Sequence, residues 1–414
     1  MLTAHLSTSQ ALERYRCGPA GPYLDEFVEW LEKRGYRART IRRYLLSAHR
    51  FALWRQNADV DFQANDGTAL EAFGVYLHQQ HGLESSSIHL AQTCIGARRF
   101  MVFLEATNRV VLSPPTSPVS TEPKLLVEFR HWMRTQRGTT EATLNNYRLT
   151  LIDLIHTLGE QPDQYEAKTL RNFILERANR WGIARAKTMV TAIRMFLRFL
   201  IATGRCAPGL DHAIPTIAQW RLAALPKYLS EEAVERVIAS CDLTTSHGLR
   251  DRAVLLLLAR LGLRAGDVAA LKLSDLNWQA ATVTVSGKSR RQNRLPLCQE
   301  VGDAILGYLD YRPVMDNDHV FLTITAPIKG LSYQAVGRIA TQAIQRAGIE
   351  APVHGSHILR YSAATQMLRR GLPLPAVGVV LRHASLETTA TYAKVDFQLL
   401  QQVVRPWPEE IATC

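Results

Sequence analysis

The chain has 414 residues, of which 47% are hydrophobic and 21% charged, and its formal net charge is +12. This composition excludes a largely disordered chain, which would be poorer in apolar residues. No apolar run reaches the roughly 18 residues that a membrane span needs, so no membrane association is expected. The N-terminal residues have no basic start followed by an apolar core, so we expect no signal peptide. The length predicts two or three domains.

The six cysteines are dispersed and form no Cys-x-x-Cys pair. This spacing gives no indication of a zinc ribbon or redox motif, and it is typical of proteins in a reducing cytoplasm. The positive charge is consistent with a polyanionic partner, and equally with a surface that only keeps the protein soluble.

The first half of the chain contains an internal duplication, recognisable from motifs that recur at a nearly constant offset. The matches are Phe27–Trp30 with Phe129–Trp132 (offset 102), Thr40–Tyr44 with Thr143–Tyr147 (103) and Phe100–Arg109 with Phe196–Arg205 (96). Apolar residues recur at three- and four-residue spacing, which predicts short amphipathic helices. We therefore expect helical domains at 1–111 and 124–222, joined by a proline-rich linker at 112–123.

Most of the excess charge lies in this duplicated half. Residues 1–222 hold 28 Lys and Arg against 20 Asp and Glu, a net of +8, which leaves +4 for residues 223–414. Two basic groups fall on predicted helices, around Lys33–Arg43 and Arg177–Arg198. Each could be an ordinary solvated face, but two at equivalent places favour contacts with DNA. The candidate DNA-binding residues are Arg39, Arg42, Arg43, Arg185, Lys187 and Arg194.

The second half, 223–396, is expected to be helical with a small sheet. Ser230 is a plausible N-cap, and an apolar helix is predicted over Arg252–Leu263. Thr282–Val285 and Leu295–Leu297 have the composition of strands, and His319–Thr323 is either a third strand or a buried edge. Helices resume after Ser332. The predicted fold class is mainly α with a small antiparallel β-sheet (α+β).

Chemistry-bearing residues occur at five places in this half. Taken one at a time, each has an ordinary explanation, such as a helix cap, a solvated turn lysine, a surface pair, a core histidine or a packing tyrosine. The motifs are Gly262-Leu-Arg264 with Asp267, the turn at Lys288, His357-Ile-Leu-Arg360, Leu381-Arg-His383 and Thr391-Tyr392.

The order and spacing of these motifs resemble the catalytic domain of the tyrosine recombinases, also called the phage integrase family. The resemblance covers Tyr228–Val395 and fills all six signature positions in order. The second helical copy resembles the family's core-binding domain, of the SAM-like kind. The first copy is not a universal feature of the family.

The resemblance implies a catalytic set that needs no metal, ATP or other cofactor. Tyr392 is the implied nucleophile, forming a 3′-phosphotyrosine, and Arg264 and Arg360 are suited to bind the phosphate oxygens. His383 is implied to donate a further hydrogen bond to that phosphate, and Lys288 to protonate the leaving 5′-oxygen.

Two further residues complete the implied site. His357 is implied to assist proton movement or to orient the phosphate. Asp267 is implied to orient the residues that bind the phosphate, without contacting the phosphate itself. Three positions depart from the family pattern. Tyr361 stands where His is common, Leu261 where Thr is common, and Arg382 where Gly is common. Arg382 would either add a phosphate contact or alter the turn before His383.

The implied function is site-specific DNA recombination by an integrase or transposase of a mobile element, in a bacterial cytoplasm and at the nucleoid. The partners would be double-stranded DNA with specific sites and a tetramer of this chain or sister recombinases, proceeding through a Holliday junction. The tail at 397–414 would dock on a neighbouring protomer or on its own domain. The alternatives are a type IB-like topoisomerase and a non-catalytic DNA-binding regulator.

Overall fold

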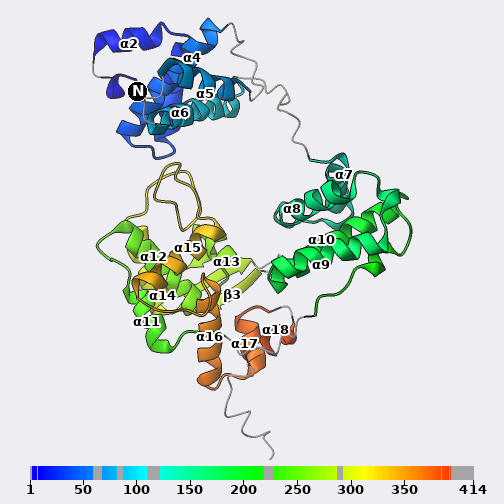
Figure 1. Ribbon diagram of the computed structural model, residues 1–414. Helices are drawn as coiled ribbons and strands as arrows, with labels where there is room; N and C mark the ends of the chain where they lie inside the picture. Colours follow the sequence, from blue (N-terminus) through cyan, green and yellow to red (C-terminus); the bar gives the residue numbers. More distant parts are fainter. Residues whose placement is uncertain are drawn as a thin grey trace, which may run out of the picture. The chain divides into compact units, whose positions relative to one another are not determined.

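A computed structural model describes residues 2–6, 8–58, 68–81, 87–109, 122–218, 227–286, 292–383, 385–390 and 392 (Figure 1). The chain divides into one compact unit of residues 1–63, 72–110 and 222–414 and a second of 64–71 and 111–221. The domain boundaries expected from the sequence remain predictions. Within the described residues, no helix combines the length and apolarity needed to cross a membrane.

The first helical region packs its helices around an aromatic core, with α4 lying against both α3 and α6. Phe27, Phe51 and Phe100 are fully buried in it. The helices are α1 (Leu2–His5), α2 (Ser9–Arg16), α3 (Gly21–Glu32), α4 (Ala38–Asn57), α5 (Thr68–His81) and α6 (Ser87–Ala106).

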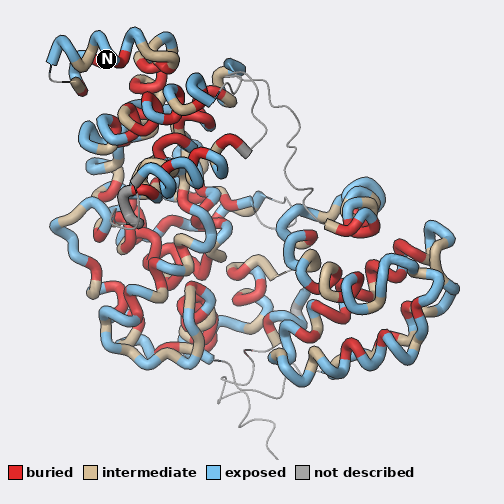
Figure 2. The backbone as a smooth tube through the Cα atoms, turned by 45° about the horizontal axis from the view of Figure 1, so that its top comes forward, coloured by how far each residue is buried: buried red, intermediate tan, exposed pale blue. Residues whose placement is uncertain are grey.

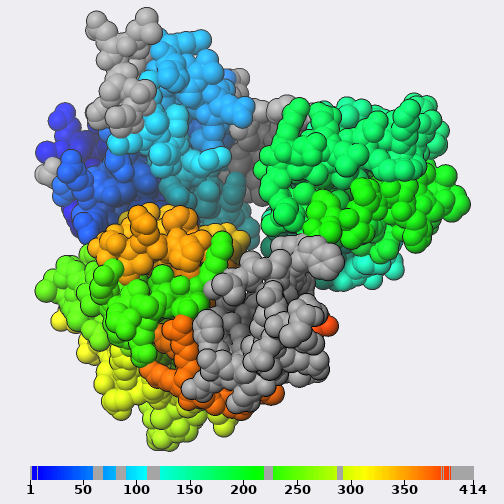
Figure 3. Space-filling view, turned by 60° about the horizontal axis from the view of Figure 1, so that its bottom comes forward, coloured from blue at the N-terminus to red at the C-terminus, as the bar shows by residue number. Residues whose placement is uncertain are grey.

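The second helical region has one continuous core, built around α10 and its packing against α7, α8 and α9. Figure 2 shows the buried face of each helix turned toward its neighbours, and Figure 3 shows the region as one continuous body. Its α-helices are α7 (Lys124–Arg137), α8 (Glu141–Leu158), α9 (Ala167–Arg180) and α10 (Ile183–Ala202), with 3-10 turns at Pro162–Gln164 and Leu210–Ala213.

The two regions share an aromatic arrangement at the duplicated positions. In the first, Phe27 lies with its ring centroid 5.2 Å from both Phe100 and Phe103. In the second, Phe129 lies 5.5 Å from Phe196 and 5.8 Å from Phe199. The tryptophans repeat as well, with centroid distances of 6.0 Å for Trp30–Phe103 and 5.8 Å for Trp132–Phe199.

An ion pair repeats with the aromatic core. Arg109 contacts Glu26 at 3.0 Å in the first region, and Arg205 contacts Glu128 in the second. In each region, the glutamate directly precedes the buried phenylalanine (Phe27 or Phe129), and the arginine lies in the loop after α6 or α10. Because packing and ion pairing recur together, the same local scaffold occurs in both regions.

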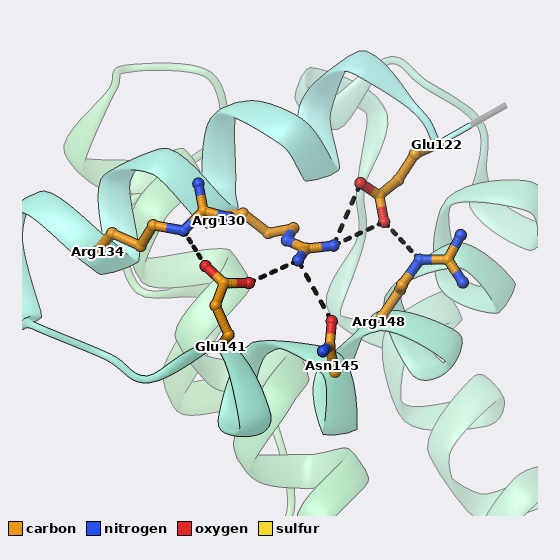
Figure 4. Close-up of polar contacts among 6 residues, drawn as sticks. All are labelled: Glu122, Arg130, Arg134, Glu141, Asn145 and Arg148. Atoms are coloured by element: carbon orange, nitrogen blue, oxygen red, sulfur yellow. Dashed lines mark hydrogen bonds and ion pairs between the residues drawn. The ribbon is translucent and has the colours of Figure 1, made fainter. Parts of the chain in front are cut away.

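Glu122 holds the start of the second region in place (Figure 4). Its carboxylate, only 12% exposed, accepts hydrogen bonds from Arg130 at 3.2 Å and from Arg148 at 2.6 Å. Arg130 also donates to Glu141 at 2.8 Å and to Asn145 at 3.2 Å. The network therefore connects the residues before α7 to both α7 and α8.

The C-terminal half is helical with a three-stranded antiparallel sheet in the order β1-β2-β3, which confirms the predicted fold class. The strands are β1 (Leu276–Asn277), β2 (Thr282–Ser286) and β3 (Gln292–Pro296), after a 3-10 turn at Leu273–Asp275. The helices are α11 (Glu231–Ala239), α12 (Ser246–Ala259), α13 (Ala265–Ala270), α14 (Gln299–Leu309), α15 (Tyr333–Arg346), α16 (His357–Arg369), α17 (Leu374–Val380) and α18 (Leu386–Ala390).

Helix α12 differs from the expectation, and the structure decides between the two forms expected for His319–Thr323. Helix α12 begins at Ser246 because the Thr245 side chain accepts a hydrogen bond from the Gly248 N–H, a cap upstream of the apolar run. His319–Thr323 is a buried edge and not a strand of the sheet, since it makes only isolated bridges while Val320 and Phe321 are buried. The third strand is Leu276–Asn277.

Gly262 lies in the turn that follows α12, in a backbone conformation that other residues adopt only with strain. Its φ is +58°, and the Leu263 N–H donates to the Leu257 carbonyl across the turn. A Cβ built there would lie 2.6 Å from Leu381 Cδ2. The glycine therefore lets two loops of this half approach each other closely.

Gly262→Ala should lower the free energy of unfolding by about 2–5 kcal/mol, combining left-handed strain with overpacking against Leu381. Urea denaturation measures this. Gly266→Ala is the control, because its φ is not left-handed and its Cβ would meet nothing within 4 Å. Equal stability of the two variants would contradict the packing described.

Candidate active site

Arg264 lies at the turn after Gly262, immediately before α13. Its backbone N–H donates to the Asp267 carboxylate at 3.1 Å, which fixes the first turn of α13. Its guanidinium donates to the carbonyl oxygen of Arg382 at 3.1 Å. Arg264 thus connects two sequence motifs that lie 118 residues apart.

Arg360, one turn into α16, is 4% exposed and joins the same motifs through their backbone. Its guanidinium donates to the carbonyl oxygens of Gly262 and Leu381. Burial, reinforced by the charges of Arg264 and Arg382, lowers the pKa of Arg360 to about 10. The group stays protonated at neutral pH, although its burial beside two other cations is costly.

Arg382 occupies the position where the family often has glycine, and the structure explains how it fits. Its φ is +55°, a left-handed value that glycine adopts without strain and that an arginine adopts at some cost. Its side chain, 4% exposed, forms an ion pair of 2.6 Å with Asp267. Its Nε and Nη1 have no hydrogen-bond partner among the described residues. The sequence did not predict this ion pair.

Three guanidiniums therefore lie close enough to influence one another, and one carboxylate, that of Asp267, pairs with Arg382 among them. Three positive charges, on Arg264, Arg360 and Arg382, face the single negative charge of Asp267. The site therefore carries net positive charge, and two N–H groups of Arg382 donate to no described residue. Buried charges of one sign are stabilised by an opposite charge. A bound anion with several oxygens, such as a phosphate, would satisfy this arrangement.

His383 and Tyr392 lie side by side at this place. Their rings stack with centroids 6.3 Å apart and an angle of 7° between planes, and His383 Nδ1 lies 2.8 Å from Thr389 Oγ1. Burial, together with Arg360 and Arg264, lowers the pKa of His383 to about 4. Its imidazole is consequently neutral at pH 7.

Tyr392 is 4% exposed and belongs to an apolar cluster with Leu368, Val377 and Leu381. Burial raises its pKa to about 12, with a further increase from Tyr361, while Arg360 and Arg264 oppose the shift. The phenol is therefore protonated at rest. A phenol with this pKa would act as a nucleophile only when a base or a developing bond removes its proton.

His357 opens α16 near these groups, with its ring 6.1 Å from that of Tyr361. Desolvation, followed by the charges of Arg360 and Arg264, lowers the pKa of His357 below its ordinary value. A neutral imidazole of this kind can accept a proton. Tyr361, where the family often has His, packs edge-on against Tyr392 at 6.0 Å.

Lys288 lies outside the described residues. Strands β2 and β3 pair up to Ser286 and Gln292, the described residues on either side of 287–291. Among the described residues, no group of three or more His, Cys, Asp or Glu side chains could hold a metal ion.

The candidate DNA-binding residues differ in what they contact. Arg194 donates to the Ile214 carbonyl at 3.1 Å and so has a structural contact, while the Arg185 guanidinium lies 4.1 Å from the Trp181 ring centroid. Lys187 is half-buried. The residues on α4 are exposed: Arg39, Arg42 and Arg43.

Comparison with known proteins identifies relatives along most of the chain. Residues 227–398 match the phage integrase family. The tyrosine recombinase XerD of Listeria innocua is 30% identical over 299 residues, covering 68% of this chain and 97% of XerD. A Sinorhizobium fredii protein named provisionally as an integrase/recombinase, y4rA, is 34% identical over 408 residues, 97% of each chain.

Solved structures share the fold. The recombinase XerH bound to its palindromic difH substrate in a post-cleavage complex aligns with a TM-score of 0.55 at 18% identity, over 80% of this chain and 93% of XerH. A lambda integrase tetramer bound to a Holliday junction aligns with a TM-score of 0.52 at 16% identity, over 75% of this chain and 88% of the integrase.

The Arg382–Asp267 ion pair should be measurable by a double-mutant cycle in urea. Asp267→Asn leaves Arg382 buried without a counter-charge and should cost about 3–5 kcal/mol of unfolding free energy. In an Arg382→Gly background, which also relieves the left-handed strain, the same change should cost much less. If Asp267→Asn costs the same in both backgrounds, the two charges are not coupled.

The low pKa of His383 predicts a pH effect on stability. Since the folded-state pKa of about 4 lies below the ordinary 6.5, the unfolded chain binds the extra proton between these values. This group should therefore lower stability as pH falls from about 6.5 to 4.

NMR titration of the imidazole measures this pKa directly, with His383→Gln assigning the resonance. Arg264→Met should raise the His383 pKa by removing a nearby positive charge. A midpoint near 6.5 in the wild-type chain would show that the ring is not desolvated beside the arginines.

Proposed function

Since the chain belongs to the tyrosine recombinases of the phage integrase family, we propose that it exchanges DNA strands at specific sites through a 3′-phosphotyrosine and a Holliday junction. The observation that carries this proposal is the assembly of Arg264, Arg360, His383 and Tyr392 around one positively charged place.

The first step is attack of the Tyr392 hydroxyl oxygen on a DNA phosphorus. A phosphorus–oxygen bond to tyrosine forms as the bond to the 5′-oxygen breaks, so one phosphodiester replaces another. His357, neutral at pH 7, accepts the phenol proton or orients the phosphate. Lys288 donates a proton to the departing 5′-oxygen.

The arginines stabilise the transition state of this transfer. Charge grows on the nonbridging oxygens as phosphorus becomes pentavalent, and rigid guanidiniums bind such oxygens in a bidentate manner. Arg264 and Arg360 are held by backbone carbonyls before DNA arrives. Because both also oppose the rise in the Tyr392 pKa, they favour the phenolate that forms during attack.

Exchange requires a second duplex, and we propose that four protomers act together, alone or with sister recombinases, on bacterial nucleoid DNA. The lambda integrase neighbour, described as a tetramer on a Holliday junction, supports this assembly. The tail at 397–414, outside the described residues, would dock within it. Integration or transposition of a mobile element is the proposed setting, supported by the y4rA relative.

The helical regions would grip the duplex. We propose a first DNA-binding domain at 1–111, a core-binding domain at 124–222 and a catalytic domain at 223–396. Arg185 and Lys187 of the core-binding domain would contact phosphates, while Arg194 donates a hydrogen bond to the Ile214 carbonyl. Such contacts give affinity that falls with salt.

Tyr392→Phe should abolish the covalent protein–DNA complex and leave DNA binding unchanged, because only the nucleophilic oxygen is lost. Denaturing gels detect the complex, and mobility shifts measure binding. Tyr361→Phe is the matched control and should still form the complex. A complex formed by Tyr392→Phe would contradict the assignment. Relaxation of supercoils without a partner site would favour a topoisomerase.

Lys288→Ala should slow cleavage by about 100-fold or more through loss of the general acid. A substrate with sulfur in place of the bridging 5′-oxygen should restore the rate, since a thiolate leaves without protonation. Single-turnover kinetics measure both rates. If the sulfur substrate gives no recovery, Lys288 acts other than as the acid.

A further inference from the structure

Helix α4 of the first region has two opposite faces. Ile41, Ala48 and Phe51 are buried against the core, at most 1% exposed. At 3.6 residues per turn, the exposed arginines lie on the other side within an arc of about 100°. They are Arg39, Arg42, Arg43 and Arg50, which we call the arginine stripe.

The stripe has no acidic neighbours along its helix. Residues 33–58 contain no Asp or Glu at all. Among the described residues, none of the four arginines forms an ion pair, and the side chain of Arg43 donates a hydrogen bond to the neutral Gln92 at 3.1 Å. By contrast, other helix-surface arginines of the described residues are paired with carboxylates, as Arg134 is with Glu141 and Arg177 is with Asp153.

The second region carries a different surface on the same scaffold. Helix α8 corresponds to α4 at an offset of 103, and four residues stand in place of the stripe: Ala142, Asn145, Asn146 and Asp153. Asn145 accepts a hydrogen bond from Arg130, and Asp153 pairs with Arg177 at 2.9 Å. The fold therefore does not require arginines at these positions.

We propose that the arginine stripe of α4 binds the phosphate backbone of duplex DNA, so that the first region adds DNA contacts of its own to those of the core-binding and catalytic domains. The inference rests on the proposed function in one respect, that DNA is the substrate. The L. innocua XerD match leaves about a third of this chain unmatched, so the first region would lengthen the DNA that each protomer covers.

The dimensions of the stripe fit this partner. Arg39 and Arg50 are separated by eleven residues, or about 16 Å along the helix. Duplex DNA carries one negative charge per about 1.7 Å of its axis, so several phosphates fall within that length. Guanidinium groups bind phosphate oxygens in a bidentate manner. An acidic protein surface is the competing occupant, and the experiment separates the two.

The experiment compares the full-length wild-type chain with the stripe variant Arg39→Ala/Arg42→Asn/Arg43→Asn, which places the second region's residues in the first. The control variant Arg16→Asn/Lys33→Asn/Arg109→Asn removes three charges from the same region, but from residues paired with Asp25, Glu29 and Glu26. Circular dichroism confirms that each variant is folded. The probe is a fluorescent duplex of random sequence, about 40 bp long, at about 50–200 mM salt.

Loss of three phosphate contacts should reduce the slope of log K against log salt by about 2.7. Over this fourfold salt range, the wild type should lose about 40-fold more affinity than the stripe variant. The control variant should keep the wild-type slope. A wild-type slope in the stripe variant would overturn the proposal, as would equal slope changes in both variants.

Two further readouts separate this proposal from its alternatives. If the stripe variant binds DNA normally but fails to form oligomers in sedimentation, the stripe contacts protein and the proposal is wrong. The covalent complex on a duplex selected by the wild-type chain tests the proposed function independently. Its absence in the wild type would refute strand cleavage, while the salt slopes would still report on the stripe.

Discussion

The site depends on one buried guanidinium that is bound by backbone rather than by a carboxylate. Arg360 donates to the carbonyl oxygens of Gly262 and Leu381, so α16, the turn after α12 and the turn before His383 are held together. Arg264 donates to the Arg382 carbonyl oxygen, and the charges of both arginines act on Arg360. The accumulated positive charge is stabilised internally by Asp267, and a DNA phosphate would complete it.

The turn at Gly262, the pairing of His357 with Arg360 on one helix and the two similar helical cores were predictable from sequence. Each depends on a residue type or spacing that few other residues could replace. Gly262 is needed for a left-handed turn, and the His-x-x-Arg spacing places His357 and Arg360 on neighbouring positions of one helix face. The duplicated aromatic residues likewise predicted two similar helical cores. These features follow from local backbone geometry and helical period, which a sequence displays directly.

Other features depend on contacts between distant segments. The pairing of Arg382 with Asp267 could not be inferred, because it joins residues 115 apart and gives an arginine a left-handed conformation. The early start of α12 depends on a threonine cap that the apolar pattern does not contain. His319–Thr323 has the composition of a strand, yet its buried segment finds no continuous neighbour to pair with among the described residues.

The most direct test is to identify the atom that carries DNA after cleavage. Trapped covalent complex would be digested with protease and nuclease and analysed by mass spectrometry. We predict a nucleotide attached through its 3′-phosphate to the peptide that contains Tyr392, with a free 5′-hydroxyl on the other DNA end. Attachment to Tyr361 or any other residue, or through a 5′-phosphate, would contradict it.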